Sequence, residues 1–374
     1  MLKPSGKCSR DARATVSTMP QPEFPIPSQL RMLAPGASST AGEREVAAGG
    51  HGPRFEQRIV ETICLPLLAH VPERVHPNAI SLTTHVIAWL TAGLAVLSLE
   101  LEGPARSLTL LGAAAGTLLS MIGDCLEVFQ GQRSGRRDRR SVLLGRWLDA
   151  VIVPLTALTV TVALDLAAPW VVLVGLTATM IYHGQLLLEH QSGRFVAPEP
   201  ATGIEARFGI SLGFAAVAVL LLWVDASARW LQLAFSLVAL AAVVIQLRCN
   251  LFYYRKLEAW LRPHLGFVAL GLSLGALYLA GAIDRIGFAI TLTFCSFRIC
   301  GSYALASAVG RAYDGRDRGL WLLLAVAALA TLGSSPWPQL ASVPPVCGNL
   351  LCLYALYRNV AEFARDTRSP SAQP

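Results

Sequence analysis

Charged residues are scarce in this chain. They make up 15% of its 374 residues, and hydrophobic residues make up 53%, whereas soluble domains contain about 25% charged residues. Apolar runs of roughly 18 to 25 residues recur along most of the sequence, and a helix needs about 20 apolar residues to cross a membrane. The composition therefore excludes an ordinary soluble domain and predicts an all-α, polytopic membrane protein.

Cysteine motifs are also lacking. The chain has eight cysteines, but no CxxC occurs and several of the cysteines fall inside the apolar runs. Cysteine in such a setting is a small apolar residue. The pattern predicts neither a disulfide framework nor a zinc site.

The first fifty residues contain no apolar run, and therefore no hydrophobic core of a signal peptide. Residues 1–50 are rich in Pro, Ser, Ala and Gly, which predicts a disordered tail. A transit peptide is the alternative, because basic residues outnumber acidic ones before Glu43. Residues 51–71 are amphipathic and too polar to cross, so we expect them to lie in the membrane interface. The membrane domain is expected over 51–361, with a cytosolic tail at 362–374.

Ten membrane spans are expected after this amphipathic segment, with boundaries good to a few residues. The last one is interrupted by Pro344 and Pro345. The ten spans are 79–99, 107–127, 144–165, 169–188, 207–224, 230–247, 265–282, 286–309, 319–334 and 341–361.

The basic residues are distributed unevenly between the two sets of span ends. Cytosolic loops collect Lys and Arg, so the richer set is expected to face the cytosol together with both termini. The net charge of +7 then reflects topology and does not indicate a nucleic-acid partner. The poorer set has Arg106, Arg229 and Arg285, and the richer set has Arg133, Arg136, Arg137, Arg139, Arg140, Arg146, Arg194, Arg207, Arg248, Arg255, Lys256, Arg262, Arg311, Arg316 and Arg318.

Three acids lie at the cytosolic ends of the second and third spans. Asp124 and Glu127 are three residues apart and share one helix face, and Asp149 follows Gly145 by four residues in the next span. Antiparallel neighbours can bring the three carboxylates together, where they would repel one another. Mg²⁺ or Mn²⁺ would relieve that repulsion, because these ions prefer oxygen ligands and often bridge to substrate phosphates.

Four features together resemble the CDP-alcohol phosphotransferase family, whose signature is D-x2-D-G-x2-A-R-x8-G-x3-D-x3-D, and in particular the eukaryotic choline/ethanolamine phosphotransferases. The first is HPNAISLT at 76–83, similar to the family's PN-[IL]-T-L. The second is the stretch 122–149 with its acids, and the third is the ten-span layout. The resemblance covers roughly 54–361. The fourth is the loop EHQSGRFVAPEPATGIE, which matches the family's spacing at Glu189, Ser192, Gly193, Pro198 and Glu205.

The signature is degenerate in this chain. The family's D-G pair is Glu127-Val128 here, and with GRWLD aligned to G-x-L-[FL]-D, the fourth acid falls at Val153. That alignment keeps the first two acids only if the loop is about four residues longer than usual. A register without insertion makes Asp149 the fourth acid, and a third register places Val128 and Gly131 at the first two acid positions.

The resemblance implies transfer of phosphoethanolamine or phosphocholine from CDP-ethanolamine or CDP-choline to a lipid hydroxyl, with release of CMP. The acceptor would be diacylglycerol, an ether diradylglycerol or ceramide. Asp124, Glu127 and Asp149 would hold the metal, and Asp149, Glu189 or Glu205 would serve catalysis, since Val153 cannot accept a proton. The resemblance also implies endoplasmic reticulum or Golgi and allows a homodimer. The donor would contact Asn78, Arg133, Arg136, Gly145 and Arg298.

Other interpretations stay open at this point. A catalytically inactive relative that binds lipid or nucleotide, or acts as a scaffold, would explain the valine at the fourth-acid position. A transporter is less well supported, because no internal repeat is evident. The acids could be solvated helix-end residues, and Asn78 could simply cap its helix. His85 and His183 are expected to be packed core histidines, and Arg298, charged within a span, points to function.

Overall fold

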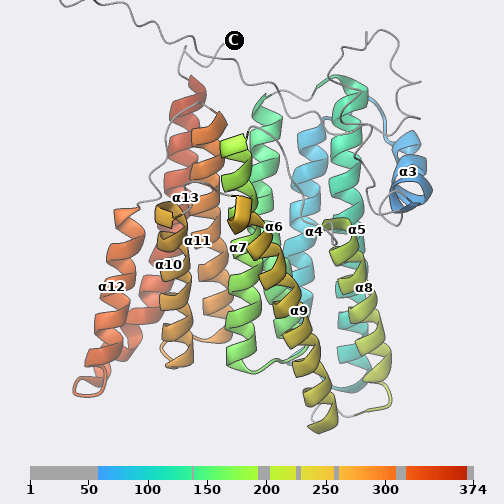
Figure 1. The fold of residues 1–374 in the computed structure, drawn as a ribbon. Helices are drawn as coiled ribbons and strands as arrows, with labels where there is room; N and C mark the ends of the chain where they lie inside the picture. Colours follow the sequence, from blue (N-terminus) through green and yellow to red (C-terminus); the bar gives the residue numbers. More distant parts are fainter. Residues whose placement is uncertain are drawn as a thin grey trace, which may run out of the picture.

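The computed structural model describes residues 58–136, 139–192, 203–224, 229–256, 261–308 and 317–368. All the regular structure in these ranges is helical (Figure 1). The expected tail at 1–50 lies outside them. Short helices η2 (Val60–Cys64), α3 (Leu65–His70) and η3 (Pro338–Ser342) accompany ten longer ones. These are α4 (Pro77–Leu97), α5 (Gly103–Ser134), α6 (Arg139–Ala163), α7 (Ala168–Ser192), α8 (Gly203–Leu220), α9 (Arg229–Lys256), α10 (Leu261–Leu279), α11 (Arg285–Ala308), α12 (Arg318–Gly333) and α13 (Val343–Arg368).

Each of the ten expected spans falls on one of these longer helices. Seven of the helices in the described ranges are long and apolar enough to cross a membrane, namely α4, α5, α6, α7, α9, α11 and η3 with α13. The others are shorter: α8 has 18 residues, α10 has 19 and α12 has 16. At 1.5 Å per residue, 16 residues extend about 24 Å, less than the roughly 30 Å of a hydrocarbon core. A multi-pass architecture follows, but the count of ten spans is not confirmed.

The helix ends differ from the expected span ends. Helix α5 continues to Ser134, where Gly135 ends it in the left-handed conformation at φ 63°, and α6 begins at Arg139. Much of the charged stretch between the second and third spans is therefore helical. Helix α13 runs to Arg368, past the expected domain boundary at 361, because helical geometry continues after the apolar run has ended.

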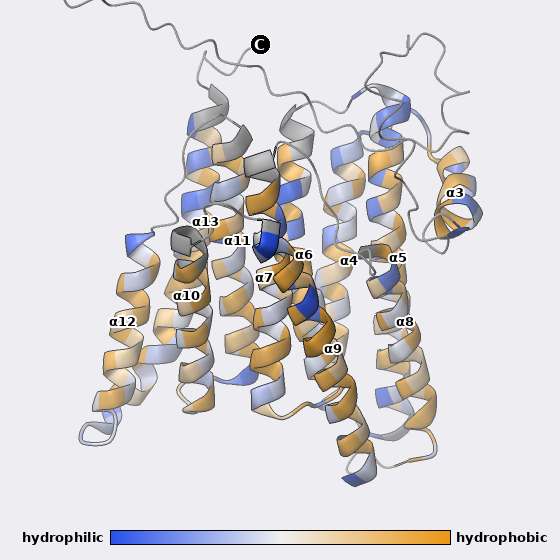
Figure 2. Ribbon diagram, in the orientation of Figure 1, coloured by the Kyte–Doolittle hydropathy of each residue, from blue (hydrophilic) through white to orange (hydrophobic). Residues whose placement is uncertain are grey.

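The exterior of the bundle is apolar. Leu90, Leu233 and Leu332 are 64%, 63% and 78% exposed, and such a surface is suited to lipid rather than to water. Figure 2 shows hydrophilic residues gathered toward the upper ends of the helices, on the side of α3 and the C-terminus. Helix α11 is central, with 83% of its spanning window buried, whereas α9 is peripheral, with 22% buried.

Helices α4 and α5 pack closely through two glycines. Gly116 and Gly123, seven residues apart on α5, face Thr91 and Thr84, seven apart on α4, and a Cβ at either glycine would collide with the threonine hydroxyl. Small residues allow this kind of backbone approach between membrane helices. Helix α6 contacts α4, and α8 contacts α5. The polar faces of the four helices therefore lie next to one another.

The amphipathic segment is helical from residue 58 onward. Ile59 and Cys64 pack against Met121 and Cys125 of α5, while Leu67 on the opposite side is 43% exposed. One face of η2 and α3 is therefore anchored to the bundle, and the other is available to an interface.

Candidate functional site

Glu127 of α5 approaches α6 at Gly145, although α4, and not α5, packs closely on α6. A Cβ at Gly145 would lie 3.2 Å from the Glu127 carboxylate oxygen Oε1. The side chain of Glu127 therefore lies against the backbone of α6, one turn before Asp149. The lack of a side chain at Gly145 permits this contact, which connects two of the motif positions that the sequence singled out.

Asp124 forms an ion pair with Arg207 of α8, whose Nη1 donates to Oδ2 of Asp124. Both side chains are mostly buried, at 16% exposure for Arg207 and 25% for Asp124. Asp149 is close enough to interact electrostatically with both of them. Two of the predicted acids therefore gather around one guanidinium. This role of Arg207 was not predicted from the sequence, where Arg207 counted only as a determinant of topology.

One face of α4 presents three polar atoms with no hydrogen-bond partner among the described residues. They are Oδ1 of Asn78, Oγ of Ser81 and Nε2 of His85, at positions i, i+3 and i+7 on one helix face. Ser81 and His85 are 1% and 6% exposed, and His85 interacts electrostatically with Asp149. An unsatisfied buried polar group costs about 1–3 kcal/mol, so this face indicates a bound polar group or water.

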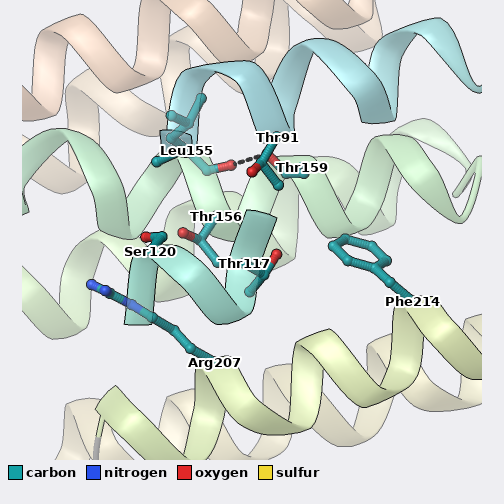
Figure 3. A pocket seen from close by; sticks show the side chains of 9 residues that line it. Thr91, Thr117, Ser120, Leu155, Thr156, Thr159, Arg207 and Phe214 are labelled. Atoms are coloured by element: carbon teal, nitrogen blue, oxygen red, sulfur yellow. Dashed lines mark hydrogen bonds between the residues drawn. The ribbon is translucent and has the colours of Figure 1, made fainter. Parts of the chain in front are cut away.

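A pocket lies below this face, between α4, α5, α6 and α8 (Figure 3). Arg207 and Phe214 of α8 stand at opposite ends of it in Figure 3. Hydroxyl side chains make up most of its wall, and the apolar remainder is Ala88, Leu155 and Phe214. The hydroxyl residues are Thr91, Thr117, Ser120, Thr156 and Thr159.

The predicted phosphate-contacting arginines bind backbone carbonyl groups. Arg133 donates from Nη1 to the carbonyl oxygen of Leu68 at 2.8 Å and from Nη2 to that of Val71. Arg136 donates to the carbonyl oxygen of Arg74 at 3.0 Å. Both arginines therefore hold the α3–α4 connection onto the end of α5. Any phosphate contact would compete with these bonds for the same N–H groups.

Arg298 lies in a separate buried network. Its guanidinium donates to both oxygens of Glu362 at 2.9 and 2.8 Å, to Oδ2 of Asp317 at 2.7 Å and to Oδ1 of Asn359 at 2.9 Å. These partners come from α13 and from the cap of α12, so Arg298 joins α11 to both helices. None of these hydrogen bonds reaches the acids of α5 or α6.

The structure only partly describes Glu189 and Glu205, the two candidate bases of the loop motif. Glu189 lies in the last turn of α7, and its side chain is outside the described residues. Glu205 is half-buried in the first turn of α8, two residues before Arg207, and residues two apart do not share a helix face. Val153 packs against an apolar cluster containing Leu143 and Trp147, so it leaves no proton acceptor at its position.

The carboxylates supply the right donor chemistry for Mg²⁺ or Mn²⁺, since these ions prefer oxygen ligands. Their arrangement does not yet form a metal site. Within the described ranges, no three His, Cys, Asp or Glu residues are placed to hold an ion together. The ion pair with Arg207 gives the reason, because one carboxylate that would bind the metal already has a cation. Asp124 would have to leave Arg207 before the three acids could close around an ion.

Comparison with protein-family models and with curated proteins identified no relative. No family model matches the sequence, and no curated protein matches it. The resemblance to the CDP-alcohol phosphotransferases therefore depends on the residues of this chain and on their arrangement, as an expectation to be tested.

Proposed function

We propose that this protein is a multi-pass membrane CDP-alcohol phosphotransferase that transfers phosphoethanolamine or phosphocholine to a lipid hydroxyl and releases CMP. One observation carries the proposal. Motif residues from α5 and α6 gather with Arg207, next to a face of α4 that contains the motif residue Asn78 and unpartnered polar atoms. Unsatisfied polar groups beside clustered charge within a membrane bundle are expected where a polar ligand binds.

The proposed membrane topology has ten spans, with the site facing the cytosol. The seven long apolar helices support a multi-pass arrangement. Helices α8, α10 and α12 would be the remaining three spans, because a short helix can cross where other helices surround it or where the bilayer is thinner. The arginine-rich helix ends lie on the side of the acids, which supports the cytosolic orientation. Residence in the endoplasmic reticulum or Golgi, and a homodimer, belong to the same proposal.

The proposed reaction forms a bond between the acceptor hydroxyl oxygen and the phosphorus that carries the alcohol. The bond from that phosphorus to the CMP oxygen breaks, and the hydroxyl proton passes to a base, for which Asp149 and Glu205 are the described candidates. A divalent ion held by Asp124, Glu127 and Asp149 would supply charge neutralisation at the pyrophosphate. Phosphoryl transfer depends mainly on positioning and electrostatics, so the loss of an acid at Val153 is compatible with turnover.

An inactive, lipid- or nucleotide-binding relative is the second candidate. Two observations favour it: Val153 is packed in an apolar cluster, and Asp124 is already paired with Arg207. Such a protein would keep its cellular role after Asp149→Ala, because no turnover would depend on that carboxylate.

The deciding experiment uses purified full-length protein in lipid nanodiscs that contain diacylglycerol, with CDP-ethanolamine or CDP-choline and Mn²⁺. We expect CMP release that depends on the acceptor and is abolished by Asp149→Asn. Thr331→Val, in α12, is the matched control. Absence of CMP release with either donor, and with ceramide as well as diacylglycerol, would overturn the enzymatic proposal in favour of the inactive one.

A further inference from the structure

The pocket beside Arg207 is lined mainly by hydroxyl side chains. Thr91, Thr117 and Thr159 each donate their hydroxyl proton to a backbone carbonyl oxygen one turn earlier in their own helix, at 2.8, 2.9 and 2.7 Å. Each oxygen therefore keeps its lone pairs but has no proton left to donate. The pocket wall is rich in hydrogen-bond acceptors and carries no charge other than that of Arg207.

Two further hydroxyl groups complete the wall. No hydrogen bond joins Ser120 or Thr156 to the described residues, although Ser120 is only 4% exposed. Figure 3 shows both side chains near the Arg207 end of the pocket. Both hydroxyl groups line the pocket, where a ligand or water can form hydrogen bonds with them.

This chemistry favours a neutral hydroxyl group over a phosphate. Lone pairs on the walls would repel anionic oxygens, whereas they accept a hydrogen bond from an alcohol. The enclosed part of the pocket has room for about one water-sized group. It therefore suits a single hydroxyl at the end of a slender group and is too narrow for a nucleotide.

The depth of the pocket favours a lipid as the source of that hydroxyl. Thr159 is ten residues beyond Asp149 on α6, or about 15 Å further along the helix axis. Phe214 provides an apolar boundary at the far end, and Leu119 and Leu212 on the same helices are 53% and 57% exposed on the apolar exterior. A water-soluble alcohol would gain nothing from such a position, whereas a membrane lipid is already present at this depth.

We propose that this pocket binds the primary hydroxyl group of the lipid acceptor, with Ser120 and Thr156 as its specific hydrogen-bond partners. The inference rests on the proposed function and assigns the acceptor subsite of that reaction. The pocket directs the hydroxyl toward the end where Arg207, Asp124 and Asp149 gather. Ser120 and Thr156 are thus positioning residues for the acceptor and make no contact with the nucleotide donor.

The test compares Thr156→Val and Ser120→Ala with Thr331→Val, a control that removes a hydroxyl in α12, outside the pocket, where it donates to the carbonyl oxygen of Ala327. Initial rates are measured against the mole fraction of diacylglycerol and, separately, against the CDP-alcohol. We expect the pocket variants to raise KM for diacylglycerol roughly three- to tenfold, the loss of one hydrogen bond, with KM for the donor unchanged. An unchanged lipid KM, or an equal rise of both KM values, would overturn the proposal.

A second measurement does not depend on turnover. Full-length protein in nanodiscs is labelled with a photoreactive diacylglycerol whose reactive group is close to its hydroxyl. Labelling of α5 and α6 that falls in the Ser120→Ala, Thr156→Val double variant, and persists in Thr331→Val, would support the pocket even if no CMP is released. Equal labelling of the double variant and the control would mean that the pocket holds only water, and the assignment would fail while the proposed function could still stand.

Discussion

Arg207→Gln tests the central contact of the site. The substitution removes the cation from Asp124 and leaves its carboxylate near that of Asp149, which keeps interactions only with His85 and Arg146 among the groups that favour its charge. An exposed pair is worth roughly 0–1 kcal/mol, and breaking a buried pair costs roughly 3–5 kcal/mol. With the side chains 16% and 25% exposed, we expect a loss of about 2 kcal/mol in the free energy of unfolding, between these limits.

The measurement is a double-mutant cycle in detergent micelles with Arg207→Gln, Asp124→Asn and the double variant. The double variant should recover much of the stability lost in Arg207→Gln, because it removes the unpaired carboxylate along with its partner. If the two single effects simply add, the pair contributes nothing and our account of the site's electrostatics is wrong.

Arg207→Gln also tests whether Arg207 competes with a metal ion for Asp124. In Arg207→Gln the carboxylates of Asp124 and Asp149 lose their internal cation, so Mn²⁺ should bind more tightly and should restore thermal stability in a concentration-dependent manner. Unbound Mn²⁺ measured by electron paramagnetic resonance gives the affinity directly. Weaker Mn²⁺ binding than in the wild-type protein would show that Arg207 does not compete with a metal for Asp124.

Three further predictions concern residues around the site. Gly123→Ala should destabilise the protein by about 1–3 kcal/mol, measured by chemical unfolding, because its Cβ would collide with Thr84, and Thr84→Gly should restore most of the loss. Arg298→Met should cost about 3–5 kcal/mol of stability by removing the buried cation that joins Glu362 to Asp317, with KM for the CDP-alcohol unchanged in protein that stays folded. Asn78→Ala should raise KM for the CDP-alcohol while KM for diacylglycerol stays constant in steady-state assays.

The positions of the helices could be predicted from the sequence, because long apolar runs leave few alternatives in a membrane. Their ends could not. Helix α5 continues to Ser134 because the polar residues after its apolar run are also good helix formers, and Gly135 stops it. Helices α8, α10 and α12, with 18, 19 and 16 residues, are about as long as the spans expected there, so their status as membrane spans, and not their length, stays unconfirmed.

The acids of the site were predicted together, but their partner was not. Asp124 and Asp149 were expected to lie close together because their spans are consecutive and antiparallel; in the structure, α4 packs on both α5 and α6. Arg207 lies 58 residues after Asp149 in the chain, and no local pattern connects them. Its place at the start of an expected span was a usable signal, because an ionisable residue within a membrane helix requires a partner. The three polar residues of α4 carried a similar signal, since Asn78, Ser81 and His85 share one helix face.

The hydrogen-bond acceptors of Arg133 and Arg136 could not be predicted from the sequence. Both were assigned to phosphate because arginine forms charge-assisted hydrogen bonds with it. In the structure they bind backbone carbonyl groups of the α3–α4 connection. Every residue carries such a group, so no residue type in the sequence marks those acceptors.

Arg298 and Arg207 differ in how completely the surrounding protein satisfies them. Arg298 has polar partners from two other elements, and its acids have partners of their own, since Asp317 also caps α12 and accepts from Tyr354. Such a closed network leaves nothing for a ligand to complete. Arg207 has one carboxylate partner, a second acid nearby, and a neighbouring α4 face whose polar atoms lack partners. Because unsatisfied polar groups destabilise a membrane protein, the atoms beside Arg207 indicate a place where a polar ligand or water binds.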